Sequence, residues 1–151
     1  MLDTNKIKKA ESSVKSYLEE GLLKKAAADQ QIMNILLRNA RESLIVAEKV
    51  YQNNLSELWV IVCSYYAMYY HANAALLKLG YKVGEKIVHK VTSDALIVFV
   101  RGKLKESLIE EYEETKEEAL NLAGIKADAL IESFEFERNK RSLIQYRTME
   151  I

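Results

Sequence analysis

Apolar residues recur at three- and four-residue steps through most of the chain, which is the pattern of amphipathic helices. The clearest example is a set of seven positions that share one helix face: Ile32, Ile35, Leu36, Ala40, Leu44, Ala47 and Tyr51. The pattern predicts a long helix from near Lys24 to Tyr51, followed by a polar turn at residues 52–54.

The stretch from Leu58 to Leu77 has a different pattern, because it is apolar on nearly every side and carries no formal charge. Its length matches the roughly 20 residues that span a bilayer. However, it contains four tyrosines, His71 and Asn73, and each polar group in lipid needs a protein partner. We therefore expect a buried central helix, capped by Ser56 and ending at Gly80, rather than a membrane span.

The remaining segments also have helical spacing. A first helix is expected from Asp3 or Thr4 to about Glu20, before Gly21. Further helices are expected over residues 91–100, 105–121 and about 126–147. Proline is absent, and no alternation of apolar and polar residues lasts long enough to indicate a strand. The sequence thus predicts an all-α antiparallel helical bundle with short connections.

Composition limits the classes of function. The 151 residues are enough for one domain, and 22 basic side chains balance 22 acidic ones. The chain therefore has no global basic excess of the kind that indicates nucleic-acid binding, and any such contact must come from a local patch. The single cysteine, Cys63, cannot form a disulfide within the chain, and the N-terminus lacks an apolar signal core. We expect a cytoplasmic protein that does not enter the membrane.

Motifs for common cofactors are missing. The sequence contains no glycine-rich phosphate loop, no cysteine pair and no His-Glu-x-x-His helix. Neither His71 nor His89 follows a carboxylate at the Glu-x-x-His spacing used in bundle metal sites. We expect no metal and no cofactor.

The segment from Glu137 to Arg147 concentrates cations in an otherwise neutral chain. On a helix, Arg138, Arg141 and Gln145 share one face, and two guanidinium groups there suit a phosphate. The alternative is structural, since basic residues near a helix C-terminus stabilise its dipole. Both interpretations remain open on the residues alone.

The central helix carries a second candidate surface. Tyr66 and Tyr70 lie one turn apart, as do Tyr65 and Tyr69, and His71 is adjacent. Packing in the core is the default role for these tyrosines, whereas a subunit interface or a platform for stacking bases is the alternative. His71 and His89 are more typical of structural histidines than of catalytic ones.

Three parts of the sequence resemble the HEPN domain family. They are Ser64–Lys82 with its Tyr-Tyr-Ala-Met element, His89 with the helix that follows it, and the segment Arg138–Tyr146. The similar branch comprises single-domain archaeal and bacterial proteins associated with nucleotidyltransferases. The resemblance covers roughly residues 32–147. It implies a HEPN-like domain over residues 32–151, with about five helices, and an extra N-terminal helix over residues 1–31.

The resemblance implies a homodimer that binds RNA or a nucleotide and has a nucleotidyltransferase-type partner, in a toxin–antitoxin-like pair. It places the central and last helices near the two-fold axis. Many members are metal-independent ribonucleases with Arg, four to six intervening residues, and His. Here the histidine positions hold other residues: Leu143, Ile144 and Gln145 after Arg138, and Tyr146, Arg147 and Thr148 after Arg141. Arg141-x4-Tyr146 resembles a variant with tyrosine in the histidine position, and a phenol with a pKa of about 10 is a poor base at neutral pH.

Three functions follow as expectations. The first is a non-catalytic protein that binds RNA or a nucleotide through Arg138, Arg141, Gln145 and Arg147, with His71, His89, Tyr66 and Tyr70 as accessory residues. The second is a metal-independent ribonuclease that lacks the motif histidine, with Arg141 and Tyr146 as catalytic candidates. The third is a structural protein-interaction module that uses the tyrosine-rich helix and the acidic face of residues 110–118.

Overall fold

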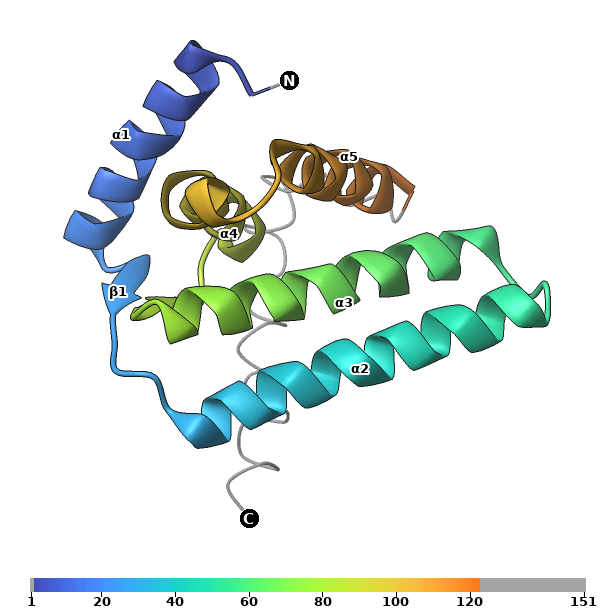
Figure 1. Ribbon diagram of the computed structural model, residues 1–151. Coiled ribbons are helices and arrows are strands. Elements are labelled where there is room, and N and C mark those ends of the chain that lie inside the picture. The colour runs from blue at the N-terminus through green and yellow to red at the C-terminus, as the bar shows by residue number, and fades with distance from the viewer. Residues whose placement is uncertain (1, 123–151) are drawn as a thin grey trace.

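The computed structural model describes residues 2–122 and confirms the all-α architecture (Figure 1). Its five helices are α1 Thr4–Glu20, α2 Gln30–Gln52, α3 Glu57–Lys78, α4 Val88–Ala95 and α5 Glu106–Leu122. Two short strands, β1 Leu23–Lys25 and β2 Tyr81–Val83, complete the regular structure of this part of the chain. The final helix expected over residues 126–147 lies outside the described residues.

Helix α3 is the central element. It forms an antiparallel hairpin with α2 on one side, and α4 and α5 pack on its other side, with α1 against α4 (Figure 1). Its buried side chains therefore occur on two opposite faces: Val62, Tyr65, Ala67, Ala72, Ala74, Leu76 and Leu77. Within residues 2–122, no helix combines the length and the apolar character needed to cross a membrane.

Side-chain caps set the predicted helix ends. The Asp3 carboxylate accepts a hydrogen bond from the Lys6 backbone N–H at 2.7 Å, and Ser56 accepts one from the Trp59 N–H at 3.3 Å. Each bond satisfies a backbone donor that the first helical turn leaves without a partner. Gly21 ends α1 in the left-handed conformation, with φ at 77°, which costs glycine little.

The expected start of the second helix at Lys24 is wrong. Residues 23–25 form β1, which pairs antiparallel with β2 in the register Leu23 to Val83, and α2 begins only after Asp29 caps it. The strand buries Leu23 and exposes both lysines, but three residues are too few for this alternation to stand out in the sequence. Gly84 lets the ribbon close, since a Cβ there would lie 3.1 Å from the Leu22 carbonyl oxygen.

The helix expected over residues 91–100 is present but irregular. Helix α4 continues as a π-helical turn over Leu96–Val100 and then a 3₁₀ turn over Arg101–Lys103. Single π-helical turns occur often at functional sites. This one places Phe99 against Tyr81 of β2, with ring centroids 3.9 Å apart.

One hydrophobic core joins all the helices except α2, which packs mainly against α3. Ala10, Val14 and Tyr17 of α1 are buried in that core, together with residues of α3, α4 and α5. Side chains of α1 and β1 therefore share a core with α3, α4 and α5.

Candidate functional site

An aromatic cluster lies between α3 and the first turn of α4. The His89 ring centroid lies 5.4 Å from that of Tyr65, 5.8 Å from Tyr66 and 4.9 Å from Tyr69. Tyr70 joins the cluster through Tyr66, at 6.1 Å, and through Tyr69, at 5.6 Å. We call these five residues the His89 cluster. The structure thus brings together three of the predicted accessory residues.

The local backbone explains why these rings meet. On α3, residues three and four apart lie on the same side, so the tyrosines converge toward α4. Ile87, directly before α4, has a φ of 42°, a left-handed conformation that is unfavourable for a β-branched residue. Because such strain persists only where the surroundings enforce it, the start of α4 and hence His89 are held in place by packing.

Inside the cluster, the Tyr65 hydroxyl and His89 Nδ1 form a 2.5 Å hydrogen bond. Burial, assisted by the neighbouring Tyr112, raises the pKa of Tyr65, which therefore keeps its proton at neutral pH. Burial, and secondarily the charge of Lys116, lowers the pKa of His89 to about 4. The imidazole is therefore neutral at pH 7.

A buried lysine stands beside the cluster. Lys116 of α5 is only 8% exposed, and its ammonium group donates hydrogen bonds to Ser93 Oγ at 3.0 Å and to Glu113 Oε2 at 3.2 Å. A serine–lysine pair is a known arrangement for nucleophilic catalysis, but it requires a neutral lysine. Here Lys116 Nζ is engaged by the Glu113 carboxylate at 3.2 Å, and Ser93 is itself buried. The geometry is that of a structural polar network.

Three further polar side chains, Tyr17, Asp94 and Tyr112, lie near this network. The Tyr17 hydroxyl of α1 donates a 2.7 Å hydrogen bond to Asp94 Oδ2 of α4. Burial raises the pKa of Asp94, and the Tyr17 bond opposes that shift. Burial also raises the pKa of Tyr112, whose ring centroid lies 5.8 Å from that of Tyr65. The Tyr112 hydroxyl makes no hydrogen bond of standard geometry within the described residues, although its proximity helps to raise the pKa of Tyr65.

His71, another predicted accessory residue, is not part of this cluster. His71 is exposed and follows Tyr69 by two residues, so it lies on a different side of α3. Arg138, Arg141, Gln145, Tyr146 and Arg147 lie outside the described residues.

The amino-acid sequence did not indicate that Lys116 and Ser93 form part of a buried polar network. The available signal was weak: Lys116 is a single cation among the glutamates of residues 110–118. The glutamates of that segment indicate a solvated face, and Glu117 and Glu118 are indeed exposed. Lys116 is instead buried with Tyr112 on the inner side of α5.

Two exposed lysines, Lys86 and Lys90, lie on either side of His89 in the sequence. Lys90 is close enough to Asp94 to oppose the rise in the pKa of that carboxyl group. The segment that carries His89 therefore also supplies two exposed cations.

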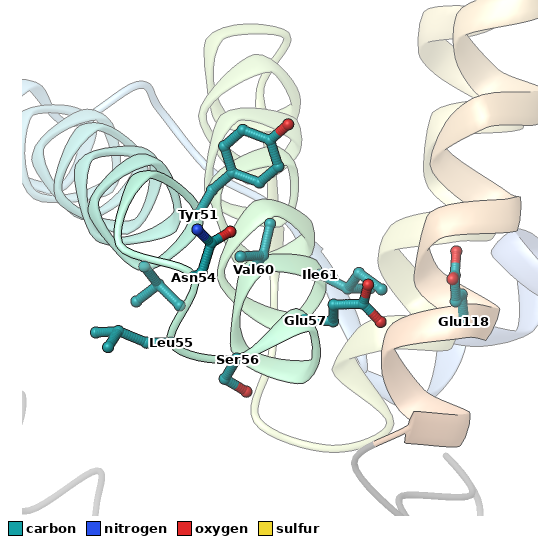
Figure 2. A pocket seen from close by; sticks show the side chains of 9 residues that line it. Tyr51, Asn54, Leu55, Ser56, Glu57, Val60, Ile61 and Glu118 are labelled. Atoms are coloured by element: carbon teal, nitrogen blue, oxygen red, sulfur yellow. The ribbon is translucent and has the colours of Figure 1, made fainter.

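A groove at the N-terminal end of α3 differs in character. It has a volume of about 680 Å³ and lies between the α2–α3 turn and α5 (Figure 2). Glu57 and Glu118 supply carboxylates at its opening, and Val60 and Ile61 form part of its wall. Two carboxylates repel a phosphate, so this groove is unsuited to a nucleotide. Within the described residues, no group of three or more His, Cys, Asp or Glu side chains is placed to hold a metal ion.

Comparison with known proteins adds no relative. No protein-family model, no curated protein and no solved structure matches this chain.

Proposed function

We propose that the protein is a HEPN-like, non-catalytic homodimer that binds RNA or a nucleotide and acts with a nucleotidyltransferase-type partner in a toxin–antitoxin-like pair. The observation that carries the binding proposal is the His89 cluster, whose α4 segment also carries the exposed Lys86 and Lys90. The HEPN assignment and the partner rest on the resemblance of residues 64–82, His89 and residues 138–146.

The chemistry of the cluster suits an unpaired base. Tyr66, Tyr69 and Tyr70 are half-buried, so each ring is held by its neighbours while part of it reaches solvent. Stacking on such a ring contributes about 1–3 kcal/mol per base and does not depend strongly on sequence. Lys86 and Lys90 supply positive charge for the phosphates that flank the base. Arg138 and Arg141 are the proposed phosphate ligands from the C-terminal segment.

The state of His89 favours binding over turnover. A general base works best when its pKa lies near the working pH, and the pKa of His89 is about 4. Its Nδ1 atom is also engaged by the Tyr65 hydroxyl. Tyr146 occupies the position of the motif histidine. The proton-transfer role that this histidine has in the family is therefore not assigned to a group with a pKa near 7.

The test is fluorescence anisotropy of a labelled single-stranded RNA, without added metal and at two salt concentrations. The variants are Arg138→Ala/Arg141→Ala, which removes two cations, and Tyr66→Leu/Tyr70→Leu, which replaces the rings with apolar side chains. Lys8→Ala/Lys9→Ala is the matched control, because it removes two exposed cations from α1. Circular dichroism establishes that each variant folds.

We expect the arginine variant to weaken binding and to flatten the salt dependence by about 1.4 in the log–log slope, since each phosphate contact on a single strand contributes about 0.7. The tyrosine variant should weaken binding by about tenfold or more and keep the slope. Equal binding by the arginine, tyrosine and control variants would refute the proposal. Cleavage of the RNA that depends on Arg141 would instead favour the ribonuclease alternative.

A further inference from the structure

The outer face of α2 exposes large apolar side chains. Among the described residues α2 packs mainly against α3, and it lies at the edge of the molecule (Figure 1). On its outer face Leu37 is 40% exposed, Leu44 47%, Ile45 48% and Tyr51 71%. Together they expose an area on the order of a few hundred Å², and patches of that size on soluble proteins often mark an interaction site.

The spacing of these residues indicates what covers them. Leu37, Leu44 and Tyr51 are seven residues apart, the repeat with which one helix packs along another. Arg41 and Glu48 lie on the same face between them, and both are exposed. The face therefore has an apolar stripe with one cation toward its N-terminal end and one anion toward its C-terminal end.

We propose that this outer face of α2 binds the same face of a second copy of the chain, with the two helices antiparallel. The two-fold axis passes near Leu44 and Ile45, which pack against their counterparts. In this register Arg41 lies beside Glu48 of the second copy, and Leu37 lies beside Tyr51 of the second copy. This places the axis at α2, rather than at the central and last helices.

Self-complementarity is the reason for choosing a second copy over an unrelated partner. A two-fold interface brings together residues equally far from the axis on opposite sides. Arg41 precedes Leu44 by three residues and Glu48 follows Ile45 by three, so the antiparallel arrangement pairs opposite charges twice. A parallel arrangement would place Arg41 against Arg41 and Glu48 against Glu48, which is repulsive.

The size of the face sets the expected affinity. From Leu37 to Tyr51 the stripe is about 21 Å long at 1.5 Å per residue. This is short compared with interfaces that bury about 800 Å² per partner. We therefore expect a dimer that dissociates on dilution.

The first test is sedimentation velocity over a wide range of protein concentration. Wild type should change from monomer to dimer with increasing concentration, and Leu44→Glu should raise the dissociation constant by about tenfold or more, because it places two carboxylates at the axis. Val46→Glu is the control, since Val46 is 47% exposed but lies on the other side of α2. It should leave the dimer unchanged.

Charge exchange provides the decisive test. Arg41→Glu and Glu48→Arg should each weaken the dimer about three- to tenfold, whereas the double variant Arg41→Glu/Glu48→Arg should restore wild-type affinity. A wild type that is monomeric at every concentration would overturn the proposal. So would a dimer that Leu44→Glu does not weaken, or a double variant that does not recover. Since the variants leave the His89 cluster and the C-terminal arginines untouched, this test is independent of RNA binding.

Discussion

Two regions of the molecule differ in the groups that they bury and expose. The side of α3 that faces α4 and α5 buries polar groups, whereas the outer side of α2 exposes apolar ones. Around His89 and Lys116, polar atoms are buried, and most of them form hydrogen bonds among side chains of α3, α4 and α5. On α2, Leu44 and Tyr51 are exposed although they belong to the apolar face that the sequence pattern defines. The first region stabilises the fold of one chain, and the second is available for association. Substitutions should therefore affect the two regions very differently.

The largest expected effect is at Lys116. Replacing it with methionine would leave the Glu113 carboxylate without its cation and Ser93 without its hydrogen-bond donor, both in a buried environment. We expect the free energy of unfolding to fall by about 3–5 kcal/mol. Urea denaturation followed by circular dichroism measures it.

The matched control for this substitution is Lys15→Met, which changes an exposed lysine of α1 and should shift stability by no more than about 0.5 kcal/mol. Similar losses at the two lysines would contradict the assignment of Lys116 to a buried network.

The second prediction concerns pH. His89 has a pKa of about 4 in the folded chain and about 6.5 when unfolded, so the unfolded state binds its proton first. The stabilising contribution is complete above pH 6.5 and is lost as the pH falls from about 6.5 to about 4. At 1.36 kcal/mol per pKa unit, the loss reaches up to about 3 kcal/mol.

The measurement is the difference in unfolding free energy between wild type and His89→Gln at several pH values, because glutamine removes this titration and leaves the carboxylates in place. The wild type should lose more stability than the variant between pH 6.5 and 4. Parallel curves for the two proteins would mean that His89 is not protected from protonation.

Within residues 2–122, the sequence predicts the helices better than the polar contacts between them. Helix positions depend on local features that can be read from the sequence, such as the caps at Asp3 and Ser56 and the apolar spacing of α5. The bond between Tyr65 and His89 joins residues 24 positions apart, and Lys116 and Ser93 are 23 apart. Which hydroxyl meets which nitrogen is decided by how helices pack, and the spacing within one helix does not contain that information. For the same reason, the periodicity of α2 could not show that Leu44 and Tyr51 are exposed.

The third prediction isolates one bond of the buried region. Tyr65→Phe removes the hydroxyl that pairs with His89 and leaves the ring in place. The buried imidazole nitrogen then has no partner, so we expect a loss of about 1.5 kcal/mol. Tyr51→Phe is the control, because Tyr51 is 71% exposed and its hydroxyl has access to water. A loss at Tyr65 no larger than that at Tyr51 would show that the bond contributes little.

The smallest expected effect is on the outer face of α2. Leu44→Ala removes an apolar side chain that is 47% exposed, so at dilute concentration the free energy of unfolding should change by no more than about 0.5 kcal/mol. Ala47→Leu, three residues away, is the contrasting variant. Ala47 is 3% exposed against α3, and added volume there should cost about 1–3 kcal/mol. A loss at Leu44 comparable to that at Ala47 would mean that the outer face is covered within a single chain. A negligible loss, together with weaker dimerisation, would mean that its apolar side chains contribute to association and little to the fold.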